Sequence, residues 1–152
     1  MKNFTYLFIT LFIYMSSAQS GDCEGRYQDE IFQTVSVETI TYSEPYNLAM
    51  DIYTPDGDNY TNRPLIIFAH GGAFIGGTKT NTTMIDLCET FAKRGYVTAS
   101  ISYRLATHST VLGTDFSSLG GLLWQTNLNN GIKVLYSAFT DSKAAARFFR
   151  KT

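Results

Sequence analysis

Two consecutive glycines directly after an apolar segment are the residues best placed for chemistry in this sequence. The segment Leu65–Ala69 is apolar throughout and runs into a His-Gly-Gly turn. Glycine tolerates a positive φ and lets the backbone approach a bound molecule closely. Backbone N–H groups held in such a turn can stabilise an oxygen that gains negative charge during a reaction. Each such donor raises the rate of the reaction by about a hundred- to a thousandfold. We therefore expect an oxyanion hole at Gly71 and Gly72; the alternative is a strand-exit turn without chemistry.

The side chains near this turn offer no complete set of catalytic groups. We expect His70 to support the loop rather than to transfer protons. A triad of Ser118, His108 and Asp115 would be local in sequence, and no strand precedes the serine to support it. We therefore find no nucleophile, acid or base in the 152 residues, and no Cys/His spacing typical of a metal site.

Composition and charge narrow the class of protein. Net charge is -1 and charged residues make up 16%, which gives no basic field for nucleic acid. Apolar residues at 44% and aromatic residues at 14% favour one packed domain.

The first eighteen residues have the pattern of a secretory signal. Lys2 provides a positive start, an apolar stretch follows, and Ser16-Ser17-Ala18 offers small residues for cleavage. About twelve apolar residues are too few to span a bilayer, although an uncleaved anchor is the alternative. We expect a mature chain of residues 19–152 that is secreted or periplasmic and, once the signal is removed, has no contact with a membrane.

Export would permit a disulfide between the two cysteines. Cys23 lies in a polar N-terminal segment, which we expect to pack loosely over residues 19–30, and Cys88 lies on an expected helix. The alternative is two unpaired thiols, with one of them buried in the core.

The first half of the chain predicts an antiparallel hairpin. Residues 31–42 alternate in hydrophobicity, as a half-buried strand does. A turn around Pro45 and Asn47 follows, and a second alternating strand begins at Leu48 and stops before Pro55.

A parallel unit should come next. Leu65–Ala69 does not alternate, which predicts a strand covered on both faces. Thr83 and Asp86 suggest a capping box for a helix that Gly95 ends, and residues 96–103 read as a second core strand. Strand, helix and strand together predict a right-handed βαβ crossover.

The last part of the chain predicts an irregular segment and one long helix. Residues 107–131 have no clear period, and either cover a pocket or form an ordinary surface excursion. A long amphipathic helix should run from about Gly131 to Arg150. Its apolar residues at helical spacing include Ile132, Leu135, Tyr136, Phe139, Ala145, Ala146 and Phe149. Asp141 on this helix can form a buried ion pair with Arg104, although a surface position is an alternative.

These motifs together resemble a known family. Residues 53–55, 64–77, 94–97 and 102–105 are similar to the N-terminal part of carboxylesterases and hormone-sensitive-lipase-like α/β hydrolases. The resemblance covers nearly all of residues 31–150. It implies an α/β fold whose mixed sheet has an antiparallel hairpin, then a parallel βαβ unit, with flanking helices. In that sheet the Leu65–Ala69 strand lies between the 96–103 strand and the strand that carries the nucleophile.

The resemblance also implies a function. The parent protein would be an exported serine carboxylic-ester hydrolase that needs no cofactor, acting on small-molecule esters or on acetyl or feruloyl esters of plant polysaccharide. The oxyanion hole would be formed by Gly71 and Gly72 with Ala73, and the catalytic serine, acid and histidine would lie beyond Thr152. The 152 residues alone would be inactive. The alternatives are a non-catalytic binding or adhesion module with the same fold, or a truncated inactive product.

Overall fold

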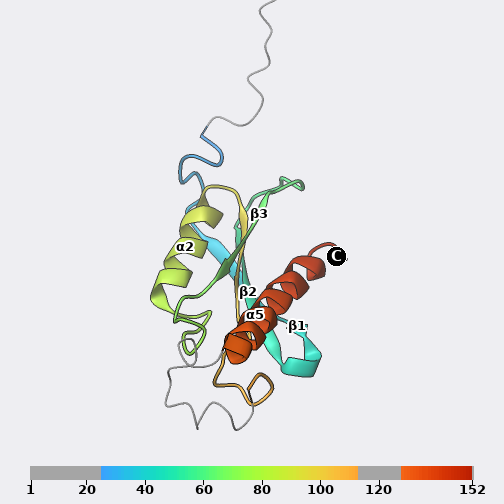
Figure 1. Cartoon of the computed structure of the whole chain (residues 1–152). Helices are drawn as coiled ribbons and strands as arrows, with labels where there is room; N and C mark the ends of the chain where they lie inside the picture. The colour runs from blue at the N-terminus through green and yellow to red at the C-terminus, as the bar shows by residue number, and fades with distance from the viewer. Residues whose placement is uncertain (1–24, 113–127, 152) are drawn as a thin grey trace, which may run out of the picture.

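The computed structural model describes residues 25–112 and 128–151, and within these ranges a mixed β-sheet lies between two helices (Figure 1). The elements in chain order are β1 (Val35–Ser43), the 3₁₀ turn η1 (Glu44–Tyr46), β2 (Leu48–Pro55), β3 (Leu65–Ala69), α2 (Thr82–Lys93), β4 (Val97–Ile101) and α5 (Leu128–Phe148).

The sheet confirms the expected α/β fold class. Among the described residues four strands have the order β1-β2-β4-β3. β1 and β2 form the expected antiparallel hairpin, and Asn47 closes its turn in the left-handed conformation with φ 49°. β4 pairs antiparallel with β2 and parallel with β3, so the chain changes from a hairpin to a parallel crossover.

The crossover helix α2 begins two residues earlier than a Thr83 cap would place it. The cap is Asn81, whose side-chain Oδ1 accepts a hydrogen bond from the backbone N–H of Met84 at 3.3 Å. The capping box that we expected at Thr83 and Asp86 is therefore wrong, because an extended asparagine stands before it and caps the first turn. Gly95 ends the helix as expected, with φ +97°.

The N-terminal segment is held more firmly than its polarity suggests. The first strand starts at Val35 rather than Ile31, because the residues before it bond to the end of α2 instead of to the sheet. The amides of Ile31 and Phe32 both donate to the carbonyl of Lys93 at 3.0 Å. Within residues 25–30 the Tyr27 amide donates to the carbonyl of Arg94 at 2.8 Å, and Arg26 forms an ion pair with Asp58. The expected loose packing of residues 19–30 is thus wrong for this described part.

The two helices cover opposite faces of the sheet (Figure 1). Alternation along the strands sends successive side chains to different layers. On the α5 side the buried cluster consists of Met50, Ala99, Ile101 and Ala145. On the α2 side it consists of Tyr53, Cys88 and Ala92, with Val35 and Phe68 packed against it.

Strand β3 has the expected bounds but is not covered on both faces. It forms an edge of the described sheet, and Leu65 and Ala69 at its ends are exposed. The expectation of full burial is wrong for this chain, because no described element pairs with the outer edge of β3 or covers its ends.

Helix α5 buries a different stripe from the one that its large apolar residues suggested. Val134, Ala138, Asp141 and Ala145 are buried. The predicted core residues Ile132, Leu135, Tyr136 and Phe139 are between 46% and 70% exposed. The helix thus has two apolar stripes, and the described chain covers the one with the smaller side chains.

The ion pair between Arg104 and Asp141 is present and buried, as the sequence analysis proposed. Arg104 Nη2 lies 2.8 Å from Asp141 Oδ1, and the backbone N–H of Arg104 donates to Asp141 Oδ2 at 2.9 Å. The pair joins α5 to the segment that leaves β4. The guanidinium also lies 3.8 Å from the centre of the Tyr46 ring.

Three expectations fall on residues outside the described ranges. These expectations are the signal segment 1–18, the pairing of Cys23, and the role of most of the irregular stretch 107–131. Cys88 is described, and its thiol is free and fully buried. Within the described ranges no helix is both long and apolar enough to cross a membrane.

Candidate functional site

The glycine turn begins where β3 ends, and its backbone requires glycine at two positions. Gly72 has φ +122°, and a Cβ atom there would lie 2.2 Å from the carbonyl oxygen of Gly76. Gly77 has φ +102°, and a Cβ atom there would lie 2.3 Å from the carbonyl oxygen of Gly71. Only a residue without a side chain fits such contacts. The outgoing limb of the turn (residues 70–72) and its return limb (residues 76–79) therefore touch through glycine backbone.

The tip of the turn is exposed to solvent. Gly71, Gly72 and Ala73 are exposed. Among the described residues, the backbone N–H groups of Gly71 and Gly72 donate no hydrogen bond. The carbonyl of Gly72, in contrast, accepts hydrogen bonds from the amides of Ile75 and Gly76 at 3.0 and 3.2 Å. The turn is thus closed on its carbonyl side and open on its amide side.

Ala73 takes a left-handed conformation, with φ 51°. A left-handed alanine is strained, since its Cβ crowds the following carbonyl. Phe74 follows with φ 60°, and its carbonyl accepts a hydrogen bond from the Ala106 amide at 2.8 Å. This contact ties the turn to the segment after β4 and helps to hold the two strained residues.

His70 lies beneath the turn and is 4% exposed. Its Nδ1 lies 2.9 Å from the carbonyl oxygen of Gly71, and its ring stacks on Tyr103 with the centroids 4.4 Å apart. Because a carbonyl can only accept, Nδ1 carries the proton in this contact. The position fits loop support, the role that we expect for His70.

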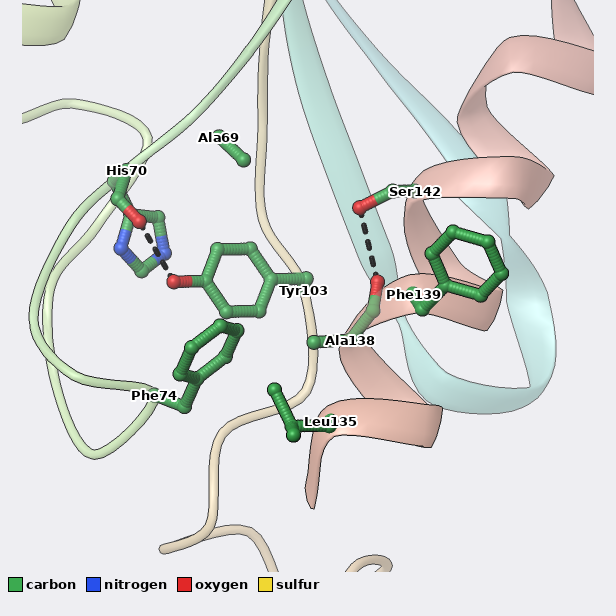
Figure 2. Close-up of a pocket in the computed structure, with 8 residues that line it drawn as sticks. All are labelled: Ala69, His70, Phe74, Tyr103, Leu135, Ala138, Phe139 and Ser142. Carbon is green, nitrogen blue, oxygen red and sulfur yellow. Dashed lines mark hydrogen bonds between the residues drawn. The ribbon is translucent and has the colours of Figure 1, made fainter. Parts of the chain in front are cut away.

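Tyr103 supports the turn and was not singled out from the sequence. Its hydroxyl donates to the carbonyl of His70 at 2.6 Å (Figure 2). Burial raises the pKa of Tyr103, so the hydroxyl keeps its proton and remains a donor. Phe74 packs with its edge toward the same ring, at 5.9 Å. The sequence analysis placed Tyr103 at the end of the expected strand 96–103, whereas β4 ends at Ile101 and Tyr103 lies in the segment after it; the sequence gives no sign of its partner.

A cavity of about 390 Å³ opens between the end of β3 and helix α5. Figure 2 shows the rings of His70, Phe74 and Tyr103 on one side and residues of α5 on the other. Most lining groups are apolar, which suits the hydrocarbon part of an organic ligand. The lining residues are Ala69, His70, Phe74, Tyr103, Leu135, Ala138, Phe139 and Ser142.

The remaining candidate groups do not gather at this site. The exposed His108 accepts a hydrogen bond at Nδ1 from the Leu105 amide at 3.3 Å. Ser118 and Asp115 lie outside the described residues. Over the described ranges, no group of three or more His, Cys, Asp or Glu side chains could hold a metal ion.

The return limb of the turn ends in a second feature that the sequence analysis missed. Lys79 forms an ion pair with Asp51 of β2, with 2.5 Å between Nζ and Oδ2, and both side chains are largely buried. A signal existed in the sequence. Leu48, Met50 and Ile52 alternate on one face of β2, so Asp51 had to point to the other face, where a charge needs a partner.

Two comparisons with known proteins found similarities. Residues 50–114 match the model of the BD-FAE family, an α/β-hydrolase-type esterase family. The crystal structure of esterase B from Lactobacillus Rhamnosis (HN001) is similar over 72% of this chain, with 23% identity and a TM-score of 0.42. This chain spans about a third of that protein, or 35% of its length.

The matched residues contain the elements that build the site. They run from β2 through β3, the glycine turn, α2 and β4 to the segment that supports the turn. The resemblance to the esterases of the α/β-hydrolase fold is therefore confirmed for the part of the chain from residue 50 to residue 114.

Proposed function

We propose that this chain is the oxyanion-holding part of an exported serine carboxylic-ester hydrolase. The observation that carries the proposal is the pair of exposed, unpaired amides at Gly71 and Gly72, next to a largely apolar cavity. The match to an esterase family over the same residues supports the reaction class.

The proposed chemistry follows from what these amides can do. A serine oxygen attacks the ester carbonyl, and the carbonyl oxygen becomes an oxyanion in the tetrahedral intermediate. The amides of Gly71 and Gly72 donate to that oxygen, and their stabilisation is greatest when the charge is fully formed. The histidine takes the proton of the attacking serine and gives it to the leaving oxygen, so collapse of the intermediate releases the alcohol and leaves an acyl-enzyme. Water then hydrolyses the acyl-enzyme to the carboxylic acid and the free serine. The serine, acid and histidine come from a part of the parent protein beyond this chain.

Ala73 is the third proposed contributor to the oxyanion hole. Its left-handed backbone continues the turn after Gly72, and the residue is exposed. We propose small-molecule esters, or acetyl or feruloyl esters on plant polysaccharide, as substrates. The apolar wall formed by Phe74, Leu135 and Phe139 is compatible with an acyl or aryl group.

The test begins with the gene. The reading frame that follows Thr152 should encode Gly-x-Ser-x-Gly within a few tens of residues. The protein encoded by the longer frame should hydrolyse p-nitrophenyl acetate, and replacement of that serine by alanine should abolish turnover. The 152-residue chain alone should not exceed a serine-free control. Robust hydrolysis by the purified 152-residue chain would refute the proposal.

A further inference from the structure

A row of polar side chains crosses three neighbouring strands on the α2 side of the sheet, and the two on β2 and β4 are buried. Thr39 of β1 lies opposite Asp51 of β2, and Asp51 lies opposite Ser100 of β4. Asp51 is 5% exposed and Ser100 is fully buried. Polar side chains in such a layer are tolerated only when they have partners.

Two of these side chains, Asp51 and Ser100, contact Lys79, and Thr39 holds the Asp51 carboxylate. The Lys79 ammonium lies 2.5 Å from Asp51 Oδ2, while Thr39 Oγ1 donates to Asp51 Oδ1 at 2.6 Å. Ser100 Oγ donates to the backbone carbonyl of Lys79 at 2.8 Å. The side chain and the main chain of Lys79 are thus held by separate strands, which fixes this residue relative to the sheet.

Lys79 stands two residues after Gly77, the glycine that lies against the other limb of the turn. A Cβ atom at Gly77 would meet the carbonyl oxygen of Gly71 at 2.3 Å and His70 Nδ1 at 2.4 Å. The Gly77 backbone is therefore packed directly under Gly71. A shift of Lys79 would move Gly77, and Gly71 would have to follow.

We infer that Asp51 is a positioning residue for the oxyanion hole. Together with Lys79 and Ser100, it anchors the return limb of the turn and so sets where the Gly71 and Gly72 amides point. The catalytic part of this inference rests on the proposed function; the mechanical part does not. Asp51 touches neither the amides nor the cavity lining, and it acts only through Lys79 and Gly77.

The mechanical part can be tested by hydrogen–deuterium exchange of the full chain at low micromolar concentration. The amides of Ile75 and Gly76 report on the turn, because both bond to the Gly72 carbonyl. Asp51→Asn should speed the exchange of a peptide over residues 74–80 by about tenfold or more, since it removes one partner of a buried pair. Ser100→Ala removes a single hydrogen bond and should give a smaller acceleration confined to the same peptide.

The matched control is the ion pair at the opposite end of the strands. Arg26 and Asp58 also lie 2.5 Å apart with nearly buried side chains. Asp58→Asn should leave the 74–80 peptide unchanged and accelerate exchange near residues 57–63. Should Asp51→Asn unfold the whole chain, Ser100→Ala still decides the matter. Equal exchange of the 74–80 peptide in Ser100→Ala and in the unsubstituted chain would overturn the inference.

The catalytic part is tested in the protein encoded by the longer reading frame. Asp51→Asn should lower kcat by about tenfold or more and leave KM within about twofold. The reason is that a displaced amide weakens binding of the transition state, which carries the oxyanion, more than binding of the uncharged substrate. Asp58→Asn should change neither constant. If exchange were faster in Asp51→Asn but kcat were unchanged, the contacts of Asp51 and Ser100 with Lys79 would be structural only, and the positioning role would be overturned. Absence of hydrolysis by the unsubstituted longer protein would refute the proposed function. The exchange data would still decide whether Asp51 and Ser100 hold the turn in place through Lys79.

Discussion

Replacement of Gly72 by alanine should damage the turn, whereas the same change at Gly71 should not. At Gly72 the new Cβ would lie 2.2 Å from the Gly76 oxygen and 2.7 Å from its carbonyl carbon. Both are backbone atoms, which cannot swing aside as the end of a side chain can. At Gly71 no heavy atom lies within 4 Å of the new Cβ, and its φ is outside the left-handed range.

The magnitude follows from two costs. A residue held in a sparsely populated backbone region costs about 1–3 kcal/mol. Forcing an extra carbon into a packed position costs about another 1–3 kcal/mol. We therefore expect Gly72→Ala to lower the free energy of unfolding by about 2–6 kcal/mol. Gly71→Ala should stay within about 0.5 kcal/mol of the unsubstituted chain, as surface substitutions usually do.

Urea unfolding followed by far-UV circular dichroism, at low micromolar protein concentration, measures both differences. Gly76→Ala is a second control, because its Cβ would also meet nothing within 4 Å. If Gly72→Ala and Gly71→Ala had the same urea midpoint, the close packing of Gly72 against Gly76 described above would be wrong.

Three further results are expected. Burial raises the pKa of the free Cys88 thiol to about 11, so a thiol reagent at pH 8 should label it only after the chain unfolds, without any need for reduction. Labelling of the native chain, or labelling of the unfolded chain only after reduction, would contradict this. Burial alone would raise the pKa of Asp58, but hydrogen bonds from Arg26 and from the Tyr60 amide, with the nearby positive charge, lower it overall. Its stabilising effect is therefore present above the unfolded pKa of about 3.9 and lost as pH falls below it, so the urea midpoints of the unsubstituted chain and Asp58→Asn should converge from pH 6 toward pH 3. The chain alone should be poorly soluble, because β3 forms an edge of the described sheet and α5 has an exposed apolar stripe. Replacing Ile132 and Phe139 of this stripe with lysine should reduce light scattering. If the unsubstituted chain stayed monomeric throughout a concentration series, this explanation would be wrong.

Local patterns predicted those features that depend on neighbours in sequence. The bounds of β3, the hairpin and the Gly95 helix end all follow from hydrophobic period and turn chemistry. The pairing of Arg104 with Asp141 was one of two alternatives that the sequence left open, and the structure decides for the buried pair, in which each charge has a partner.

The features that the sequence did not reveal depend on what lies opposite in space. In α5 both Ile132 and Val134 belong to apolar stripes, and helical periodicity cannot say which stripe a given sheet will cover. The cap at Asn81 was missed because a capping box two residues later was equally regular. The Asp51–Lys79 pair joins residues 28 apart, and only the alternation of β2 hinted that Asp51 needed a partner.

The turn is anchored on both of its limbs, and this bears on how the proposed oxyanion hole would work. The outgoing limb is held by the Tyr103 hydroxyl on the His70 carbonyl, and the return limb by the contacts of Lys79. Donors stabilise a developing charge most when they need no rearrangement as it forms. A loop fixed at one limb could rotate about that anchor, whereas two separate anchors leave the amides between them little freedom. The glycines allow the shape of the turn, but the buried tyrosine and the buried ion pair keep it in place.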